Sequence, residues 1–539
     1  MKREHIARYM KTSRRGDRQV IFPVYLSIFL ALSLTCTTTA VAYGQTVDKL
    51  ESATDAYIRE SFSDRGIPGI AVVIVKDGQV TYLSGYGVTN VEDPSPVTPQ
   101  TIFDLASCSK SFTALGILLL ENDGLLDLDS PIDDYLPGLR FADPGAESII
   151  TVRDLLDHTS GLPGVFSEPL AFQTGEDAMT KLILAMKKVH LNRPVGSSFE
   201  YSNMNYSLLG AIIENRTRKK FEDFMQDRIF SPLGMTNTTL YPAVAAGKDR
   251  ASGHQLRFGK IVVSDIEIYR SAAPAGWVMS TAEDMGKWLL MQLNDGNVDN
   301  QQVIPQELIL KCHEPEVEFV QNGEKVAYGM GWLSTVSPDG TRVIWHGGDT
   351  PNFVAEMILV PEYDFGISML VNGQTNDHIH DIAVNIVNLE LGTEVALPDA
   401  PWWASWAAVD RLAAGALGLS FIFLISMVIF LYRKLKNRHK AQESTTGDPG
   451  KKSILRIWKI ALPTAPLALI SIGVVAAFVF VQLYVGFNIF KIISRFGSYA
   501  PPGVMISAIT LLIMICLWAL TLAGTTLLRL PFRSKKHER

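Results

Sequence analysis

The sequence predicts an α/β domain with an antiparallel sheet flanked by helices and an inserted helical region, followed by a three-helix transmembrane region. Strand patterns lie near both ends of residues 43–400, and a long helical pattern separates them. This arrangement is expected when one sheet is assembled from both ends of a domain around a helical insertion. Three long apolar segments near the C-terminus predict the transmembrane helices.

The first 42 residues (1–42) have the pattern of an export signal. Seven Lys or Arg residues lie among the first 18, an apolar run follows from Val20 to Leu34, and small residues follow up to Ala42. This order is typical of a secretory signal, and an uncleaved N-terminal anchor is the alternative. Both interpretations send the next segment out of the cytoplasm. The net charge of -6 is mild and gives no support for a nucleic-acid partner.

The domain at residues 43–400 opens with a predicted hairpin. Residues 69–76 (GIAVVIVK) and 79–87 (QVTYLSGYG) are rich in strand-forming residues and surround Asp77-Gly78, which favours a two-residue turn. Helical patterns then dominate from about residue 107 to 235.

Strand patterns return late in the domain. They lie at residues 341–345, 352–359 and 366–371, and a helix with one apolar face is predicted at 380–391. We expect the two early and three late strands to form one sheet, and a cleft between the sheet and the helical region is the natural place for a binding site.

The transmembrane helices are predicted at residues 401–432, 460–490 and 503–528. The segment 433–459 holds nine Lys or Arg residues, and the tail at 529–539 holds five. By the positive-inside rule both are cytoplasmic, which places the domain at residues 43–400 on the extracytoplasmic side of a cell membrane that the chain crosses several times. Within these helices, the apolar runs at 412–431, 460–490 and 504–528 contain no charged residue. This favours anchoring in the lipid bilayer, or docking to a membrane-protein partner, over transport.

Cysteine and histidine usage predicts neither a disulfide framework nor a metal site. The four cysteines lie at positions 36, 108, 312 and 516, and the first and last fall in apolar segments. The histidines show no convincing metal-ligand spacing, so we expect no metal and no cofactor.

The segment 103–115 (FDLASCSKSFTAL) carries the first candidate catalytic residues. Ser107 precedes Lys110 by three residues, which places both side chains on one face of a helix. A serine at a helix start is commonly an N-cap, and this is the alternative interpretation. A nucleophilic serine also needs a base and donors for an oxyanion.

Three further segments contain candidate partners. Tyr201 and Asn203 precede an apolar helix, and a tyrosine beside a protonated lysine has its phenolate favoured, so Tyr201 is a candidate base. In the alternative interpretation, Tyr201 is only an aromatic residue in a loop and Asn203 only a turn or cap residue. Gly347 and Gly348, after His346 at the end of a strand pattern, form a turn or let a substrate backbone lie against the strand edge. The third segment, 157–163 (DHTSGLP), is an ordinary turn sequence.

In this order, the motifs resemble the serine β-lactamase and penicillin-binding-protein superfamily, in its class C-like branch of β-lactamase-related hydrolases. The likeness extends over about residues 48–393 and takes in MSTAEDM, where Ser280 and Glu283 have the spacing of a capping box. The resemblance implies a β-lactamase/transpeptidase-like fold.

The resemblance also implies residue roles. Ser107 is expected to attack a carbonyl and become acylated, while Lys110 and Tyr201 share the proton transfers. Asn203 is expected to orient the substrate or Lys110, and the backbone N–H groups of Ser107 and Asp349 to form the oxyanion hole. Water then releases the acyl group. The separate glutamate of class A enzymes has no convincing counterpart, so Tyr201 is the default base for that step.

Two departures from the family pattern concern the substrate. Penicillin-binding relatives have a lysine where this chain has His346, and Asp349 adds a negative charge nearby. This difference predicts a preference for uncharged or amine-bearing substrates over carboxylates; alternatively, His346 only forms hydrogen bonds within the strand end. The layout is also similar to membrane-anchored peptidases that mature precolibactin by removing an acyl-D-asparagine cap. Those peptidases tend to have serine at the position of Asn203 and asparagine at that of Thr350.

The sequence therefore predicts a membrane-anchored serine hydrolase acting on a small peptide, an acyl amide or an ester. A D-stereospecific or prodrug-activating peptidase, a cell-wall D-Ala carboxypeptidase, an esterase and a β-lactamase remain open alternatives on the same machinery. A non-hydrolysing membrane sensor or scaffold is the alternative from another class.

Overall fold

The computed structural model describes residues 53–65, 67–164, 173–321, 323–373, 376–392 and 406–442, together with single residues between 507 and 521. The predicted export signal at 1–42, the span at 460–490 and the tail at 529–539 lie outside these residues, as do most of the loop at 433–459 and of the span at 503–528.

An eight-stranded antiparallel sheet forms the centre of the domain, with the strand order β2-β1-β14-β13-β12-β11-β10-β9. Its strands are β1 (Gly69–Lys76), β2 (Gln79–Gly87), β9 (Val317–Gln321), β10 (Glu324–Gly329), β11 (Trp332–Val336), β12 (Arg342–Asp349), β13 (Val354–Val360) and β14 (Phe365–Val371). The first and last parts of the domain meet where β1 pairs with β14, in register from Ile70↔Val371 to Lys76↔Phe365. The sheet is thus assembled from both ends of the domain, as the strand patterns predict.

The strands β1 and β2 have the predicted bounds. The turn between them uses Asp77 (φ 52°) and Gly78 (φ 70°), and two positive φ values match the twist of a two-residue hairpin. The prediction of five strands is wrong in number, because β9, β10 and β11 extend the sheet beyond β12. The edge strand β9 alternates half-buried and exposed residues, so its apolar pattern is weak. The strands β10 and β11 lie inside the sheet and carry more buried residues.

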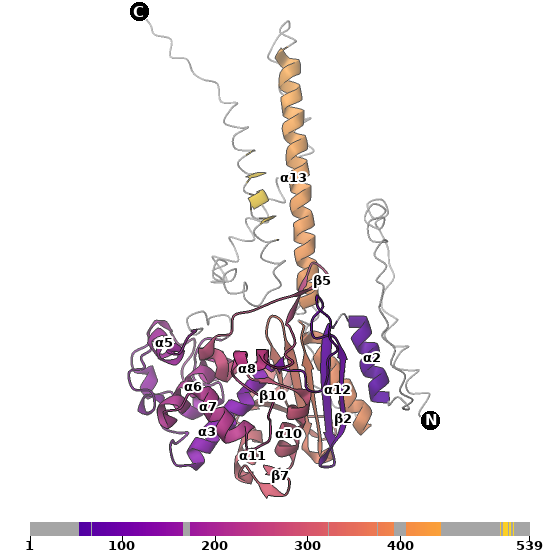
Figure 1. The fold of residues 1–539 in the computed structure, drawn as a ribbon. Helices are drawn as coiled ribbons and strands as arrows, with labels where there is room; N and C mark the ends of the chain where they lie inside the picture. Colours follow the sequence, from indigo (N-terminus) through magenta and orange to yellow (C-terminus); the bar gives the residue numbers. More distant parts are fainter. Residues whose placement is uncertain are drawn as a thin grey trace, which may run out of the picture. The chain divides into compact units, whose positions relative to one another are not determined.

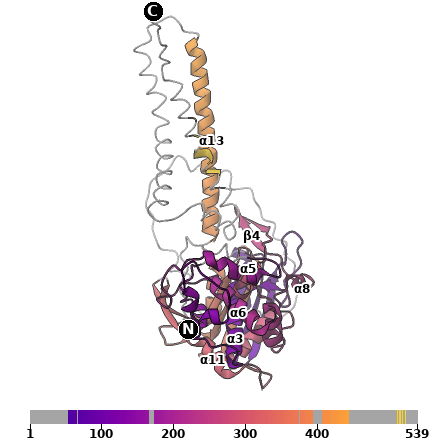
Figure 2. The same ribbon diagram turned by 90° about the vertical axis from the view of Figure 1, so that its left-hand side faces the viewer.

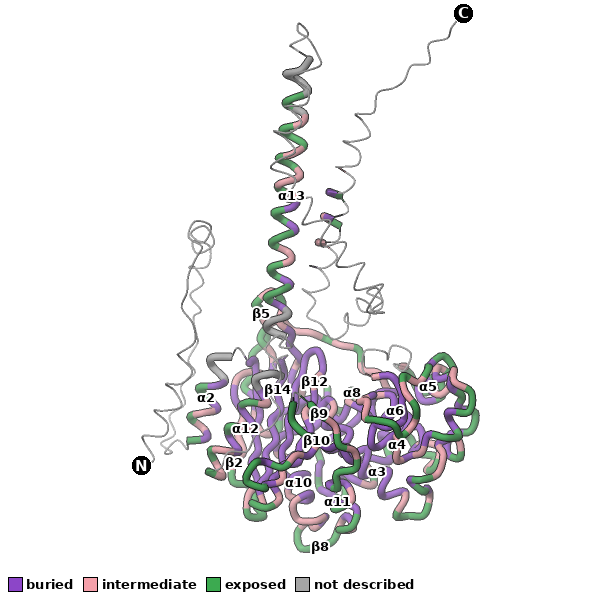
Figure 3. Tube along the Cα trace, turned by 180° about the vertical axis from the view of Figure 1, so that it is seen from behind, coloured by how far each residue is buried: buried purple, intermediate pink, exposed green. Residues whose placement is uncertain are grey.

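Helices cover both faces of the sheet (Figures 1 and 3). The helices α2 (Ala53–Arg65) and α12 (Asn376–Leu391) cover one face, where apolar side chains such as Ile74, Ile358 and Ile382 pack in one cluster. A larger cluster on the other face contains α3 (Ser109–Asn122) and α10 (Ala282–Leu293) and continues into the inserted helical region. The layered arrangement follows from the alternation of strand side chains between two apolar faces.

The inserted region consists of short helices around α6 (Asn203–Thr217) (Figure 2). The α6 residues from Met204 to Ile213 are all buried. The other helices are α4 (Val152–Leu156), α5 (Ala178–Ala185), α7 (Phe221–Met225), α8 (Pro242–Ala246), α9 (Ala273–Gly276) and α11 (Gln306–His313). Short helical turns lie at η1 (Ala106–Cys108), η2 (Ile132–Asp134), η3 (Ala146–Ser148), η5 (Met186–Lys188), η6 (Gln226–Phe230), η7 (Arg270–Ala272) and η8 (Pro361–Tyr363). Small ladders pair β3 (Phe103–Asp104) with β6 (Met279–Ser280), β4 (His254–Arg257) with β5 (Lys260–Val263), and β7 (Asn297–Val298) with β8 (Gln301–Gln302).

The cap of α10 differs from the predicted capping box. Thr281, not Ser280, is the N-cap, and its hydroxyl accepts a hydrogen bond from the backbone N–H of Asp284. Ser280 instead pairs with Phe103 in the β3–β6 ladder, and its hydroxyl lies 2.7 Å from that of Thr238. The strand pairing holds Ser280 in extended backbone, so the helix begins one residue later than the spacing suggests.

The helix α13 (Trp406–Gln442) includes the first predicted transmembrane span. Its segment from Asp410 to Lys434 is long and apolar enough to cross a membrane, and no other helix in the described part of the chain meets this criterion. The helix continues ten residues beyond the predicted end of the span at 432.

Candidate active site

Ser107 lies in the helical turn η1, between β3 and α3. The preceding residue, Ala106, has a positive φ of 47°, which is uncommon for a residue with a side chain. The helix α3 begins at Ser109, and its N-cap is Cys108, which forms no side-chain cap hydrogen bond. The alternative that Ser107 is the N-cap is therefore wrong.

Lys110 is completely buried, and its side-chain nitrogen contacts three oxygen atoms. The Nζ atom lies 3.1 Å from Ser107 Oγ, 2.7 Å from Asn203 Oδ1 and 2.7 Å from the carbonyl oxygen of Ala275. The oxygens of Asn203 and Ala275 are acceptors, so both occupy N–H groups of Lys110. In the neutral amine, the remaining position of Nζ is a lone pair that faces the Ser107 hydroxyl, which is the geometry needed to take its proton.

Tyr201 lies beside this pair. Lys110 Nζ is 4.8 Å from the centre of the Tyr201 ring and 5.6 Å from that of Tyr206. The two tyrosines reach the lysine from the loop before α6 and from its first turns, respectively. The start of α6 therefore brings together Tyr201, Asn203 and the lysine, although 93 residues separate Asn203 from Lys110.

His346 is buried on β12 and is held in its neutral form. Burial, followed by the charge of Lys110, lowers the pKa of His346 to about 3. Its Nδ1 lies 2.7 Å from the carbonyl oxygen of Gly347, and because a carbonyl only accepts, Nδ1 carries the proton. Nε2 is therefore an acceptor. It is buried and has no hydrogen-bond partner among the described residues.

The two glycines after His346 have different environments. A Cβ atom on Gly348 would lie 2.9 Å from the backbone nitrogen of Ser107 and would also overlap the carbonyl oxygen of Leu105. The missing side chain thus lets β12 lie directly against residues 105–107, in the turn that carries Ser107 (the nucleophile turn). A Cβ atom on Gly347 would instead meet the carboxylate of Glu356, at 2.9 Å from Oε2.

One edge of β12 is open beside Ser107. The strand β11 pairs with Arg342 to Trp345, whereas β13 pairs with β12 as far as Asp349. Within the described part of the chain, no strand pairs with residues 346–349 on the β11 side. An extended substrate segment can add to this edge through backbone hydrogen bonds. Asp349 ends the strand and is half-buried.

Thr350 is engaged in a turn after β12. Its hydroxyl accepts a hydrogen bond from the backbone N–H of Phe353 at 3.0 Å and lies 3.2 Å from Asn352 Oδ1. These local contacts occupy the side chain within the turn.

The segment 157–163 has a larger part in the site than its turn sequence suggests. His158 is fully buried, and its ring lies 4.5 Å from the Tyr201 ring and 4.8 Å from the Tyr328 ring, measured between ring centres. No sequence pattern predicted a role for His158, Tyr328 or Ala275. The DHTSGLP motif was the available signal for His158, whereas a backbone carbonyl such as that of Ala275 has no sequence signal.

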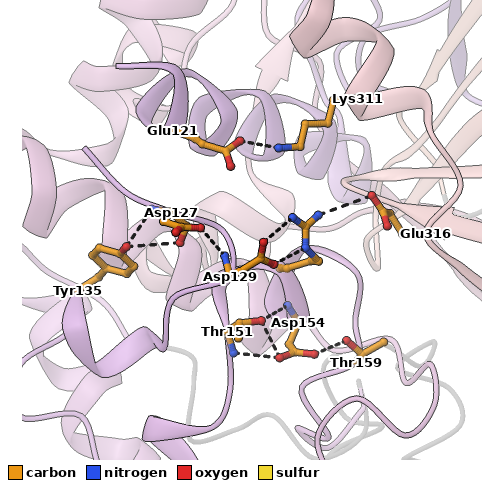
Figure 4. A network of polar contacts seen from close by, with 10 residues as sticks. Glu121, Asp127, Asp129, Tyr135, Thr151, Asp154, Thr159, Lys311 and Glu316 are labelled. Atoms are coloured by element: carbon orange, nitrogen blue, oxygen red, sulfur yellow. Dashed lines mark hydrogen bonds and ion pairs between the residues drawn. The ribbon is translucent and has the colours of Figure 1, made fainter. Parts of the chain in front are cut away.

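A network of polar contacts holds the helix before this segment (Figure 4). Arg153 on α4 donates to Asp129 at 2.7 Å and lies 3.7 Å from Glu316. Thr151 and Asp154 form a capping box at the start of α4, and Asp154 also accepts a hydrogen bond from the Thr159 hydroxyl at 2.7 Å.

In the described part of the chain, Cys108 and Cys312 are both buried free thiols. Burial raises the pKa of each, so neither is activated as a thiolate. No group of three or more possible metal ligands occurs among the described residues.

Comparisons with known proteins identify relatives of this chain. The beta-lactamase family model matches residues 47–387. Protein flp of Staphylococcus aureus strain MW2 is 30% identical over 318 residues, which is 59% of this chain and 62% of that protein. Penicillin-binding protein 4* of Bacillus subtilis is 28% identical over 53% of this chain and 64% of its own length. The chain thus spans somewhat less than two thirds of these two relatives.

A solved structure gives the same result. The octameric penicillin-binding protein homologue from Pyrococcus abyssi matches with a TM-score of 0.54 and 28% identity, covering 63% of this chain and 77% of that one. The family model covers more than half of the chain and includes Ser107, Lys110, Tyr201 and His346. The chain therefore belongs to the beta-lactamase family, within the superfamily that includes the penicillin-binding proteins.

Proposed function

We propose that this protein is a membrane-anchored, extracytoplasmic serine hydrolase that cleaves an amide or ester bond through an acyl-enzyme on Ser107. The observation that carries the proposal is the buried Lys110, whose Nζ lies 3.1 Å from Ser107 Oγ while two other oxygens hold it in place. Members of the beta-lactamase superfamily are serine hydrolases. A buried lysine beside a serine has no structural purpose that a less costly apolar residue would not serve.

The proposed reaction begins when Ser107 Oγ attacks the substrate carbonyl and its proton passes to Lys110 or Tyr201. The tetrahedral oxyanion is stabilised by the backbone N–H groups of Ser107 and Asp349, next to the close approach of Gly348. The leaving group then takes the proton, and the acyl-enzyme forms. Water, activated by Tyr201, releases the acyl group and restores the serine hydroxyl.

The role proposed for Asn203 follows from its contact with Lys110. From the sequence alone, Asn203 is expected to orient either the substrate or the lysine. Its Oδ1 accepts a hydrogen bond from Lys110 Nζ at 2.7 Å, which supports the role of orienting the lysine. This contact holds Nζ towards the Ser107 hydroxyl and limits its rotation.

The substrate is proposed to be a small uncharged or amine-bearing peptide, acyl amide or ester, rather than a carboxylate. His346 is neutral and its Nε2 accepts, so this position offers no cation for a substrate carboxylate. Asp349 adds a negative charge at the end of the same strand. A substrate N–H or ammonium group suits both side chains.

The D-asparagine preference of precolibactin-maturing peptidases is not part of this proposal. Thr350 forms hydrogen bonds within its own turn, and Asn203 contacts Lys110. Neither contact supports recognition of an asparagine side chain. Removal of another acyl cap, as in other prodrug-activating peptidases, remains compatible with the site.

The membrane topology is proposed from the charge pattern and from α13. The segment from Asp410 to Lys434 supplies the first span, and the apolar segments at 460–490 and 503–528 supply the other two. Reporter fusions at residue 445 and after residue 539 should both be cytoplasmic, and a fusion at residue 400 should be exported. An exported reporter at residue 445 would contradict this topology.

The hydrolase proposal is tested by labelling the full chain in membranes with a fluorescent serine-hydrolase phosphonate. Labelling should disappear in Ser107→Ala and fall strongly in Tyr201→Phe. Equally strong labelling of the wild type and Ser107→Ala would contradict the assignment of the nucleophile. No labelling of the wild type would favour a non-hydrolysing sensor or scaffold.

Turnover separates an enzyme from a slowly deacylating sensor. Intact-protein mass spectrometry after addition of an activated ester should show a transient acyl adduct on an enzyme and a permanent one on a sensor. A fluorescent penicillin tests the charge preference, because Asp349→Asn should label faster than the wild type. Tight penicillin binding that is lost in His346→Ala and unchanged in Asp349→Asn would contradict the proposed charge preference.

A further inference from the structure

The backbone on both sides of Tyr201 is tied to one residue, His158. The backbone N–H of Glu200 donates to the carbonyl oxygen of His158 at 2.8 Å. The backbone N–H of Ser202 donates to Nδ1 of the same histidine at 3.3 Å. Asn205, in the first turn of α6, lies 2.8 Å from that Nδ1 through its side-chain amide.

The backbone conformation of His158 makes this double contact possible. Its φ is +60°, in the left-handed region that most side chains avoid. The residue directly follows α4 and Asp157, and the network of Arg153, Thr151 and Asp154 holds that helix in place. The turn therefore presents both the carbonyl and the ring of His158 to the loop that carries Tyr201.

The hydrogen bonds also determine the tautomer of His158. A backbone N–H only donates, so Nδ1 accepts from Ser202 and the proton of the neutral ring is on Nε2. Burial, then the charge of Lys110, lowers the pKa of His158 well below its ordinary value. The ring is therefore neutral, and it does not add a second buried cation beside Lys110.

The ring of His158 is packed among aromatic side chains. Its centre lies 4.5 Å from that of Tyr201, 4.8 Å from Tyr328 and 5.3 Å from Tyr206. Nε2 is buried and has no hydrogen-bond partner among the described residues, so its N–H faces this aromatic cluster. Tyr201 thus contacts the neutral ring of His158, and the centre of the Tyr201 ring lies 4.8 Å from Lys110 Nζ.

We propose that His158 is a positioning residue for Tyr201: it clamps the backbone of Glu200 and Ser202 and packs its ring against the Tyr201 ring. This inference rests on the proposed function, because it assigns His158 to proton transfer by Tyr201. His158 itself does not touch the reacting atoms. Its effect on acylation passes through the placement of the Tyr201 hydroxyl relative to Ser107 and Lys110.

His158→Asn is the informative variant. Asparagine tolerates a positive φ, and its Oδ1 can accept from the Ser202 N–H in place of Nδ1, but it lacks the ring. The matched control is His313→Asn, which removes another buried neutral histidine, whose ring lies 5.5 Å from Trp332 at the end of α11. Both variants are compared with the wild type as full chains in membranes, with thermal unfolding to verify folding.

The decisive measurement is a double-mutant cycle on the rate constant of phosphonate labelling. His158→Asn should lower this rate about 10- to 100-fold in the wild-type background, as expected for a misplaced catalytic group. In a Tyr201→Phe background the same substitution should change the rate less than about twofold, because there is no hydroxyl left to position. His313→Asn should leave the rate unchanged in both backgrounds.

Several outcomes would overturn the proposal. An equal loss in both backgrounds would assign His158 a purely structural role, and a wild-type rate in His158→Asn would assign it none. If Tyr201→Phe is too slow to measure, saturation kinetics decide: a lower maximal rate at unchanged probe affinity supports positioning, and weaker affinity at an unchanged rate refutes it. A wild-type chain that never labels would instead refute the proposed function.

Discussion

Gly348→Ala provides the sharpest test of the site geometry. An added Cβ atom would lie 2.9 Å from the backbone nitrogen of Ser107 and 3.0 Å from Ala106 Cβ, whereas ordinary contacts begin at 3.4 Å. The overlap with the carbonyl oxygen of Leu105 is more severe. All three clashing atoms belong to residues 105–107, in the turn that carries Ser107. The strand β12 and this turn must therefore move apart by about half an ångström or more.

This displacement acts directly on catalysis. It separates the proposed oxyanion donors at Ser107 and Asp349, which must be placed to within about 0.5 Å to act together. We expect the rate constant of phosphonate labelling to fall about 10- to 100-fold, since a shift of about 1 Å costs about 100-fold. Overpacking should also lower the free energy of unfolding by about 1–3 kcal/mol.

Gly347→Ala is the matched control for this experiment. Its Cβ atom would meet the end of the Glu356 side chain, which can move, and would not approach the nucleophile turn. The two variants differ by one position and add the same methyl group. If both proteins fold and the labelling rate constant of Gly348→Ala lies within about threefold of that of Gly347→Ala, the close approach of β12 to the nucleophile turn is not needed for the site.

Three further predictions concern stability and membrane insertion. Burial and the nearby Glu316 raise the pKa of Asp157 from 3.8 to about 7, so the folded state holds this proton more tightly and the free energy of unfolding should fall as the pH rises from about 4 to 7. Asp157→Asn should remove this loss. The melting temperature of the variant, relative to that of the wild type, should therefore rise between about pH 4 and pH 7; a difference that does not change with pH would contradict the assignment. Arg250 contacts the two carboxylate oxygens of the buried Asp104 at 2.7 and 2.9 Å. Arg250→Met leaves that carboxylate without its partner and should lower the free energy of unfolding by about 3–5 kcal/mol in denaturant titrations. The double variant with Asp104→Asn should recover part of this loss. In α13, Ile422→Lys places a charge midway along the apolar segment and should reduce membrane insertion in a reporter assay of residues 406–442, whereas Leu435→Lys, beyond its end, should not; equal insertion would argue against a spanning helix.

Local sequence patterns were sufficient where neighbouring residues decide the structure. The bounds of β1 and β2 were predictable because Asp77-Gly78 favours a turn whose twist matches the flanking strands. The three-residue spacing of Ser107 and Lys110 likewise predicts that their side chains meet, and Nζ lies 3.1 Å from Oγ. These features depend on backbone preferences over a few residues.

Other features were predictable only in part, because long-range pairing competes with local preference. The capping-box spacing of Ser280 and Glu283 failed by one residue, since pairing with Phe103 keeps Ser280 in a strand. The edge strand β9 was missed because its exposed positions weaken the apolar alternation on which strand prediction depends. The strands β10 and β11, which lie inside the sheet, were also missed.

By itself, the sequence determined the order of the motifs, the hairpin at the start of the sheet, the assembly of the sheet from both ends of the domain, and the family. Only the tertiary structure decided which groups surround the serine. The carbonyl of Ala275 is 165 residues from Lys110, and the bonds of His158 to the Tyr201 loop join two segments more than 40 residues apart. Such contacts form because burial forces each polar group to find a partner in three dimensions, and the identity of that partner depends on the whole fold.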